Sequence, residues 1–286
     1  MILLDYSSIA HSALHINIKE IEQNIDLVRH TIFNIIRQYN VEHRDQFGEM
    51  ILCMDHTSNW RREAFPQYKA SRRKARKESD VDWQMVYTEL NKVRDELMEN
   101  GPYRCIRIEG CEADDVIGAI CEAHSNPSPI LIISPDKDFV QLQKYPNVKQ
   151  YSNLQKKWVE PEVSAEYDLL VKVLKGDTGD GVPNVLSDDE TFINEERQTP
   201  LTRKKIEALM ANPEALGTTI ARRIVRNRTL IDLTRTPEDI KEETDAAFTN
   251  RPNGSITKMM TLLAKHQMKM MMESLSDFEP RFLEYN

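Results

Sequence analysis

Acidic residues recur in this sequence at the points where hydrophobic runs end. The run "ILIISPDKD" brings Asp136 and Asp138 just after four apolar residues, and Asp5 and Asp55 follow "MILL" and "MILCM" in the same way. The segment "CEADD" adds three more acids, which are Glu112, Asp114 and Asp115. A single Asp at a strand end is commonly a helix N-cap, and acids in a first helical turn suit the helix dipole. Four such segments in one chain indicate a shared site instead.

Carboxylates that converge raise one another's pKa unless a cation neutralises them. Asp136 and Asp138 are two residues apart, so in extended backbone both side chains project to the same side. The set contains no His or Cys, and its all-oxygen ligands suit Mg²⁺, with Mn²⁺ able to substitute, better than Zn²⁺. More carboxylates than one ion can use predict two ions roughly 4 Å apart, an arrangement typical of phosphodiester hydrolysis.

A second acidic pair lies in the glycine-rich segment "LKGDTGDGVPNV". Asp177 and Asp180 are three residues apart and could supply ligands for the second ion. The predicted phosphate contacts of this segment are Lys175, Gly176, Gly179 and Gly181. Glycines allow tight turning with exposed backbone N–H groups, which can form a nest for a DNA phosphate. An ordinary Gly/Asp turn is the alternative interpretation.

The charge of the chain is unevenly distributed. The formal net charge is −8, which alone argues weakly against a nucleic-acid partner. The 17 residues from 61 to 77, however, contain eight Lys or Arg and one Glu. Such a run is often a solvated face, but this one is interrupted by aromatic residues and favours a loop or helical arch over about 60–80 that faces phosphates. Its predicted contacts are Arg61, Arg62, Tyr68, Lys69, Arg72, Arg73, Lys74, Arg76 and Lys77.

The first half of the chain alternates between strand-like and helix-like segments. Strands are predicted over 1–5, 50–55, 103–110 and 130–136, and helices over 17–39, 81–99 and 111–124. This alternation predicts an α/β fold with a central, mostly parallel sheet flanked by helices, here assigned to residues 1–162. The carboxyl ends of parallel strands form the usual ligand crevice, so the acids are expected to converge there.

The second half, residues 163–286, is predicted to form a smaller all-helical C-terminal domain. Its helical segments are 168–176, 200–211, 219–230 and 255–274. The Met-rich stretch 258–272 favours core packing by adaptable side chains, with a partner-binding surface as the alternative. No apolar run approaches the roughly 20 residues of a membrane span, and the first residues lack the basic region of a signal peptide. The four cysteines lack metal-type spacing, so we expect reduced thiols and a cytoplasmic protein.

The ordered set of acids resembles that of the 5′-nuclease (flap endonuclease) family, which includes the N-terminal nuclease of bacterial DNA polymerase I. The segments "WRREAFPQYKASRRKARKES", "DFVQLQKYPNVKQYS" and "KKWVEP" are similar to the bacteriophage ribonuclease H branch of this family. The resemblance covers most of residues 1–210 and implies a PIN-like fold. It also implies a Mg²⁺-dependent 5′→3′ exonuclease and flap endonuclease that removes RNA primers during DNA replication, acting on RNA–DNA hybrids and on 5′-flap or forked DNA.

The resemblance also assigns roles to individual residues. The implied metal ligands are Asp5, Asp55, Glu112, Asp114, Asp115, Asp136, Asp138, Asp177 and Asp180. The family places a Tyr-Lys pair and a following Arg beside the scissile phosphate, so the implied catalytic residues are Lys69, Arg72, Arg73 and Asp136. A helix–three-turn–helix that grips duplex DNA is expected to begin at Val171. After Pro183 the sequence departs from the family pattern, and Arg203, Lys204 and Lys205 could provide the missing contacts.

A monomer in the host cytoplasm is expected, and the resemblance suggests a sliding clamp and a single-stranded-DNA-binding protein as partners. Two other classes of function compete with the nuclease. A phosphatase with an Asp-x-Asp nucleophile would need that pair early in the chain, where Asp5 is followed by Ser7. A DNA-binding accessory protein would use its acids only structurally. Metal-dependent cleavage of a 5′-labelled duplex separates the three.

Overall fold

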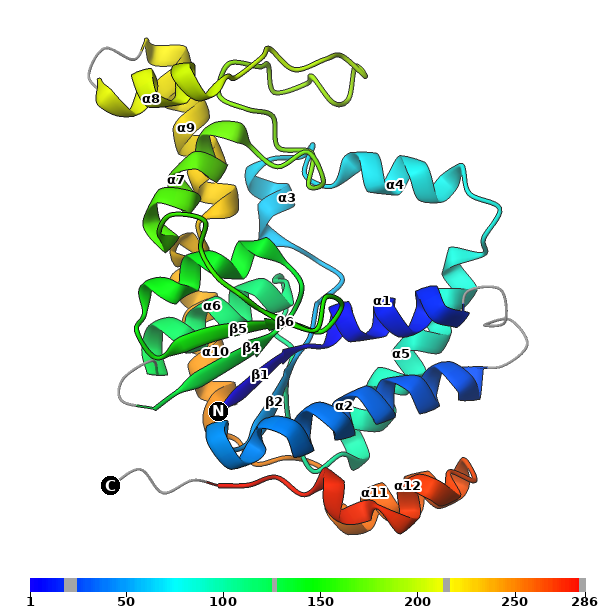
Figure 1. Ribbon diagram of the computed structural model, residues 1–286. Helices are drawn as coiled ribbons and strands as arrows, with labels where there is room; N and C mark the ends of the chain where they lie inside the picture. The colour runs from blue at the N-terminus through cyan, green and yellow to red at the C-terminus, as the bar shows by residue number, and fades with distance from the viewer. Residues whose placement is uncertain (18–24, 125–127, 213–216, 283–286) are drawn as a thin grey trace.

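The computed structural model describes residues 1–17, 25–124, 128–212 and 217–282. Within these ranges the chain is built around a six-stranded sheet in the order β3-β2-β1-β4-β5-β6 (Figure 1). The strands are β1 (Ile2–Asp5), β2 (Met50–Cys53), β3 (Arg104–Ile106), β4 (Ile130–Ile133), β5 (Val148–Ser152) and β6 (Lys157–Val159). All neighbouring strands pair in parallel except β6, which is antiparallel to β5. The predicted α/β fold with a mostly parallel sheet is confirmed.

Strands β1, β2 and β4 are short, apolar and buried on both faces because helices cover the sheet from either side. Ile2 and Leu4 belong to the core of one face, and Leu3 and Ile51 belong to the core of the other. This alternation follows from the two-residue period of a strand. The helices that contribute to the first core are α1 (Tyr6–Asn17), α2 (Ile25–Phe47) and α5 (Trp83–Asn100). The opposite core includes side chains of α6 (Ala113–His124) and α10 (Glu238–Thr249).

A cationic arch connects β2 to α5. It consists of α3 (Trp60–Ala64) and α4 (Ala70–Lys77), and Figure 1 shows α4 standing away from the sheet. No side chain of α4 is buried. The base of the arch is held down, however, because Phe65 and Tyr68 pack in a small core with Val173 and Leu230. The arch therefore presents charge to solvent from a fixed base.

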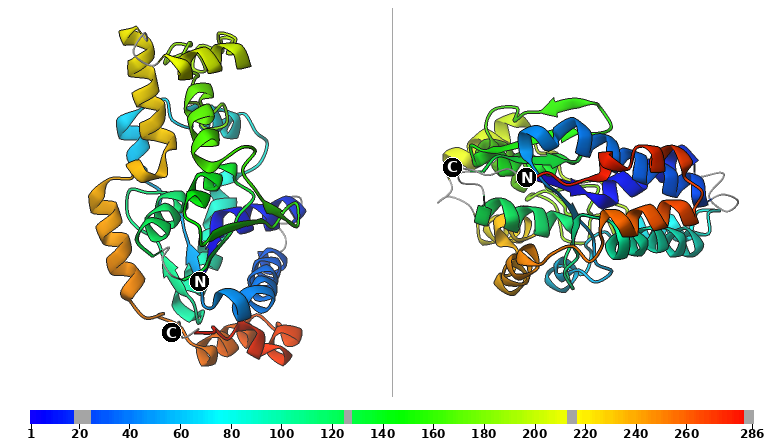
Figure 2. Two further views of the ribbon diagram at one scale, coloured as in Figure 1. Left: turned by 60° about the vertical axis from the view of Figure 1, so that its left-hand side comes forward. Right: turned by 90° about the horizontal axis from the view of Figure 1, so that it is seen from below.

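The region after residue 163 is helical, as predicted, but its helices do not share a single core. Helices α7 (Ala165–Lys175), α8 (Arg203–Ala211) and α9 (Thr218–Ile231) enclose a small core around Leu174, Val185 and Ile206. Helices α11 (Ile256–Lys265) and α12 (Lys269–Glu273) instead return to the sheet and pack with the core that contains α2 and α5 (Figures 1 and 2). The predicted boundary at 162/163 falls in the connection between β6 and α7.

The Met-rich segment packs only in part as expected, since Met259, Met268 and Met271 are buried but Met270 is exposed. Four elements were not predicted: α1, β5, β6 and α10. The predicted helix over 17–39 corresponds to α2, which begins at Ile25 and continues to Phe47, and residues 18–24 lie outside the described residues. The cysteines are free thiols. None of the helices in the described part of the chain is long and apolar enough to cross a membrane.

Candidate active site

The acids converge in one crevice at the carboxyl edge of the sheet. The crevice has a volume of about 860 Å³ and lies where β1, β2 and β4 end. Its acidic lining residues are Asp5, Asp55, Glu112, Asp114, Asp136, Asp138 and Asp177. Parallel strands bring their carboxyl ends to the same edge of a sheet, which explains why residues from distant parts of the chain meet here.

Three of these residues, Asp5, Asp114 and Asp136, form a group that we call the sheet-edge acids. Asp5 ends β1 and accepts hydrogen bonds from Ser134 Oγ at 2.8 Å and from Ser8 N at 3.1 Å. Burial, followed by the nearby charge of Asp55, raises the pKa of Asp5 to about 7. These hydrogen bonds orient the carboxylate but do not neutralise it.

The other two sheet-edge acids resist ionisation for the same reasons. Burial, together with the charges of Asp136, Glu112 and Asp5, raises the pKa of Asp114 well above its usual range. The pKa of Asp136 is raised by loss of solvent, although its side chain still reaches the crevice and Lys172 partly opposes the shift. Carboxylates held this close need an additional positive charge to ionise together.

Asp177 and Asp180, which we call the turn acids, lie among cations of the protein itself. Lys172 Nζ is 2.9 Å from Asp177 and also pairs with Asp138. Burial opposes ionisation of Asp177, but Lys172 outweighs it and lowers the pKa. Arg72 donates to Asp180 Oδ1 at 2.6 Å, and Lys69 Nζ lies 3.6 Å from the same carboxylate. Even so, burial outweighs these cations and the pKa of Asp180 is raised.

Lys69 connects the arch to the crevice. Its ammonium donates to Glu112, and this pair changes both pKa values. Burial opposes the charged form in each case, but Lys69 with Arg61 lowers the pKa of Glu112 to about 2, and Glu112 with Asp180 raises the pKa of Lys69. Lys69 has a left-handed backbone with φ of 54°, and its N–H donates to Asp180 O at 2.7 Å. The turn thus fixes where this lysine enters the crevice.

Asp55 lies two residues after β2 and is anchored on both oxygens. It accepts from Ala113 N at 2.8 Å and from Ser7 Oγ at 2.7 Å. Among the described residues, no group of three Asp, Glu, His or Cys side chains is already arranged to hold a metal ion. Four of the acids are instead paired with lysines, since Lys69 lies beside Glu112 and Asp180 and Lys172 lies beside Asp138 and Asp177.

Two residues predicted for this site are directed elsewhere. Asp115 was predicted as a metal ligand, but it is fully buried and accepts two hydrogen bonds from Arg61, at 2.7 and 2.8 Å. Thr236 and Trp60 donate to the same carboxylate. Arg61 was predicted to contact nucleic acid, but it is 2 % exposed and also donates to Leu230 O at 2.8 Å. Through its contacts with Asp115 and Leu230, Arg61 joins the base of the arch to α6 and to the end of α9.

Tyr68, Gly176, Gly179 and Gly181 were also predicted to contact nucleic acid, and in the structure they contact other parts of the protein. Tyr68 is buried, and its hydroxyl lies 2.9 Å from both Glu112 and Asp180, so the ring is not available to a base. The N–H groups of Gly176 and Gly181 donate within the turn, to Lys172 O and Thr178 O, so they do not form an open phosphate nest. Gly176 has φ of 68°, and a Cβ there would lie 2.3 Å from Val182 O, so only glycine fits. Asp177 also accepts from the N–H of Gly179, the third glycine predicted to contact phosphate.

The remaining cations of the arch are exposed, as a phosphate-facing segment requires. These are Arg62, Arg72, Arg73, Lys74, Arg76 and Lys77. A second cavity of about 370 Å³ lies between the arch, α1 and α5, and shares Asp55, Lys69 and Glu112 with the acidic crevice. The acidic and cationic surfaces are therefore continuous.

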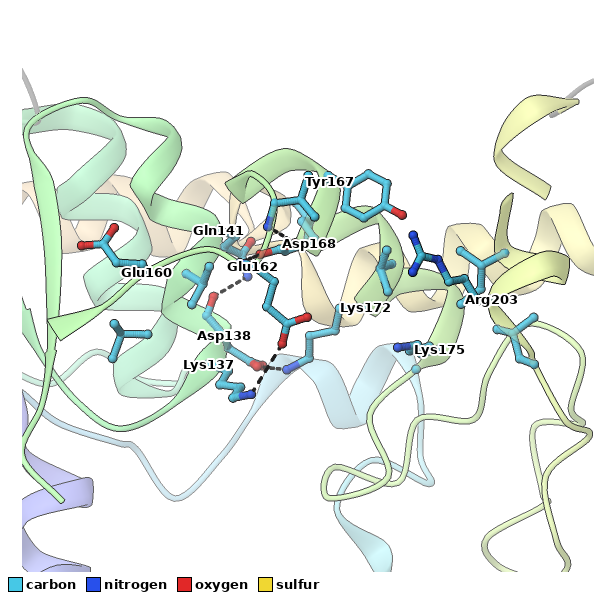
Figure 3. Close-up of a pocket in the computed structure, with 18 residues that line it drawn as sticks. Lys137, Asp138, Gln141, Glu160, Glu162, Tyr167, Asp168, Lys172, Lys175 and Arg203 are labelled. Carbon is cyan, nitrogen blue, oxygen red and sulfur yellow. Dashed lines mark hydrogen bonds and ion pairs between the residues drawn. The ribbon is translucent and has the colours of Figure 1, made fainter. Parts of the chain in front are cut away.

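A third cavity of about 560 Å³ adjoins the crevice on the side of α7 (Figure 3). Lys172 is directed toward Asp138 at its edge, and Lys175 and Arg203 line its far side. Lys172 is the main site residue that the sequence analysis missed. Lys172 lies in the last turn of α7, just before the segment that contains Asp177 and Asp180. This closeness in sequence to predicted site residues could have identified it.

A parallel sheet whose carboxyl edge gathers acids beneath a cationic arch is typical of a nuclease. Residues 1–168 match the family model of the 5′-3′ exonuclease N-terminal resolvase-like domain, and residues 163–278 match that of the T4 RNase H C-terminal region. The chain belongs to the 5′-3′ exonuclease family, and it is a phosphodiester hydrolase.

The similarity extends over most of the chain. The chain is 38 % identical to "Ribonuclease H" of Enterobacteria phage T4 over 252 residues, which cover 83 % of this chain and 82 % of that protein. A "5'-3' exonuclease" of Mycoplasmopsis pulmonis is 28 % identical over 49 % of this chain and 44 % of its own. The solved structure of phage T5 5′-exonuclease with bound zinc superposes with a TM-score of 0.61 at 19 % identity, covering 87 % of this chain and 98 % of that one. This last comparison shows the shared fold.

Proposed function

We propose that this protein is a Mg²⁺-dependent 5′→3′ exonuclease and flap endonuclease that removes RNA primers and adjacent DNA from 5′ ends during replication. The observation that supports it best is the meeting of seven acids, three lysines and a cationic arch around one crevice. The substrates would be RNA–DNA hybrids and 5′-flap or forked DNA. The T4 relative is named a ribonuclease H, and a T5 flap endonuclease has been solved with DNA and metal ions.

The all-oxygen chemistry of the acids suits hard divalent cations, and their number suggests two ions. Burial is the largest cause that raises the pKa of Asp5, Asp114 and Asp136, so a bound cation would be needed for all three to ionise together. We assign the first ion to these sheet-edge acids and the second to Asp138 and the turn acids. Bound ions would supply Lewis-acid stabilisation of the phosphate and of the attacking and leaving oxygens. Mn²⁺ should substitute, because it accepts the same oxygen ligands.

The protein's own residues would bind and orient the strand. Lys69 and Arg72 enter the crevice from the arch, and each is now paired with a carboxylate. When a phosphate enters, these cations would exchange a carboxylate for a phosphate oxygen and offset the charge that develops during cleavage. Tyr68 would hold Glu112 and Asp180 in place during this exchange, since its hydroxyl lies within hydrogen-bonding distance of both.

The exposed arch cations would act at a greater distance from the cleaved bond. Arg62, Arg73, Lys74, Arg76 and Lys77 have no place among the crevice acids, so their contribution would come from contacts with flanking phosphates and release of counterions. Duplex beyond the cut would lie along α7 and α8, where Lys175 and Arg203 line the adjoining cavity. A sliding clamp and a single-stranded-DNA-binding protein remain the proposed replication partners.

The test uses three substrates with a 5′ label: an RNA–DNA hybrid, a 5′-flap duplex and a blunt duplex. With Mg²⁺ we expect short products from the 5′ end of the hybrid and release of the intact flap, and with EDTA we expect no cleavage. Hydrolysis of a small phosphate monoester without cleavage of nucleic acid would indicate the phosphatase alternative. Binding without any cleavage would indicate an accessory DNA-binding protein.

A further inference from the structure

A hairpin that the proposed mechanism leaves unused reaches the mouth of the acidic crevice. It connects β5 to β6, and Figures 1 and 2 show its tip beside α1. Leu154 at this tip is 62 % exposed. The same side chain lines the crevice together with His11, Asp5 and Asp136. A large apolar side chain thus stands in water within a site otherwise lined by charge.

The hairpin is fixed to the segment that contains Asp136. The Gln150 side chain donates from Nε2 to Ser134 O at 3.0 Å and to Asp136 O at 2.6 Å. At the tip, Gln155 N donates to Ser152 Oγ at 3.1 Å. These bonds hold the loop at a defined position relative to the catalytic carboxylates.

Aromatic packing stiffens the hairpin further. The ring of Tyr151 packs edge-on against Trp158 at 5.4 Å, and His43 of α2 lies 5.6 Å from Tyr151 and 6.2 Å from Trp158. Tyr39 lies 6.0 Å from Tyr151. Side chains from both hairpin strands are therefore joined to α2, and the exposed tip rests on a rigid base.

The charge of the hairpin suits a polyanion. Residues 145–159 contain no Asp or Glu, and Lys149, Lys156 and Lys157 are exposed. Lys156 adopts the left-handed conformation with φ of 50°, which turns the chain back toward β6 immediately after the tip. The loop therefore combines one exposed apolar side chain at the crevice with exposed lysines beside it.

We infer that Leu154 packs against the terminal base pair of a bound duplex and so determines which phosphate enters the crevice, while Lys156 and Lys157 contact the adjoining backbone. Apolar side chains inserted at base steps are a recurring way to unstack and position nucleic acid, and lysines contact phosphates without regard to sequence. The inference rests on the proposed nuclease function and adds a positioning residue to it. An isolated exposed leucine is common on protein surfaces, so the experiment must distinguish a role in positioning from simple exposure.

The experiment compares full-length wild type with Leu154→Ala and Leu154→Met on a 5′-labelled flap duplex, in single-turnover reactions with Mg²⁺. For Leu154→Ala we expect cleavage to slow about tenfold and the products to spread over neighbouring phosphates, because the apolar contact with the terminal base pair is lost. Leu154→Met keeps apolar volume and should cut at the wild-type position within about twofold of its rate. Val41→Ala, at an exposed apolar position outside the crevice, is the control and should change neither.

A second readout does not depend on cleavage. With 2-aminopurine in the terminal base pair and EDTA present, wild-type binding should increase the fluorescence, and Leu154→Ala should give a smaller increase at equal saturation. If Leu154→Ala cleaves at the wild-type rate and position and gives the wild-type fluorescence, the inference is wrong, but the proposed function is not affected. If the wild type binds the duplex but does not cut it, the proposed function fails, and the fluorescence comparison still decides whether Leu154 touches the base pair.

Discussion

The sheet-edge acids and Asp177 line the same crevice, and Asp180 pairs with Lys69 and Arg72 of its lining, but the two groups of acids differ in the positive charge around them. Asp5 and Asp114 face mainly other acids, whereas Asp136 also lies near Lys172, and burial is the largest cause that raises the pKa of each. Asp177 is paired with Lys172, which lowers its pKa despite burial. Asp180 lies between the two cases, because Lys69 and Arg72 reach it without overcoming the effect of burial. Within these two groups, the cations of the protein thus lower the pKa of Asp177 only, and they do not offset the effect of burial on the sheet-edge acids.

This difference matters for the free energy of folding as well as for chemistry. A carboxylate that is buried among like charges destabilises the folded state when it is ionised, whereas a paired carboxylate stabilises it. The sheet-edge acids are therefore expected to lower stability when they are ionised. The pairing of Lys172 with Asp177 is expected to have the opposite effect.

The largest effect is expected for Asp136→Asn. Loss of this sheet-edge carboxylate should reduce single-turnover cleavage by on the order of a thousandfold, because it removes a ligand at the centre of the proposed metal site. Without metal the variant should melt at the same temperature as wild type or a few degrees higher, since it removes charge repulsion. A variant that unfolds, or one that cleaves normally with Mg²⁺, would contradict the assignment.

The next effect separates the lysine at the crevice from the cations of the arch. Lys69→Ala should slow the chemical step by on the order of a hundredfold with little change in binding, because its charge acts on the transition state. Neutralising Lys74, Arg76 and Lys77 together should instead weaken binding and lower its salt dependence by roughly two to three in the log–log slope. Lys92→Ala on α5 is the surface-lysine control.

The chemical step is measured as the cleavage rate with enzyme in saturating excess. Binding is measured as the dissociation constant over a range of salt concentrations. If the two sets of substitutions affect rate and binding equally, then Lys69 has no role beyond general attraction. The comparison between the two sides of the crevice would lose its functional meaning in that case.

A smaller effect concerns stability and pH. The pKa of Asp5 is raised to about 7 in the fold, so the metal-free protein should lose stability as pH rises from about 4 to about 7. At pH 8 in EDTA, Asp5→Asn should therefore raise the melting temperature by a few degrees. Asp177→Asn should lower it by a similar amount, because a carboxyl with a lowered pKa stabilises the fold above its ordinary pKa.

Melting curves at pH 5.5 and pH 8, with and without Mg²⁺, test these signs. Added Mg²⁺ should reduce the pH dependence of wild type, since a bound cation offsets the repulsion that the sheet-edge acids create. Equal shifts of the same sign in both variants would remove the distinction between the two groups of acids.

The sequence was sufficient to predict the convergence of the acids, because strand ends and parallel pairing determine it. Contacts between distant segments were not predictable in the same way. Arg61 belongs to a strongly basic run, and only its partner Asp115, 54 residues away in sequence, makes it a buried structural residue. Lys172 likewise finds Asp138 through the packing of α7.

The elements that were missed have local explanations. β5 and β6 have the sequences "VKQYS" and "KWV", which are short and partly polar because they lie toward the edge of the sheet. Helix α10, "EDIKEETDAAFT", has a weak hydrophobic pattern in its sequence. Only Ile240 and Thr244 of this helix are buried. Helix α1 follows β1 without a turn, so no Gly or Pro marks its start. In each case tertiary packing supplies what the local pattern lacks.

The most direct test of the two-sided crevice is titration calorimetry with Mn²⁺ on wild type, on Asp136→Asn and on the double variant Asp177→Asn/Asp180→Asn. Wild type should bind two ions. The double variant should keep one ion, fold normally and cleave more slowly than wild type, because the sheet-edge acids are untouched. Asp136→Asn should lose the ion that the double variant keeps. If the double variant binds as many ions as wild type with unchanged affinity, the turn acids belong to the turn alone and the account of two metal positions is wrong.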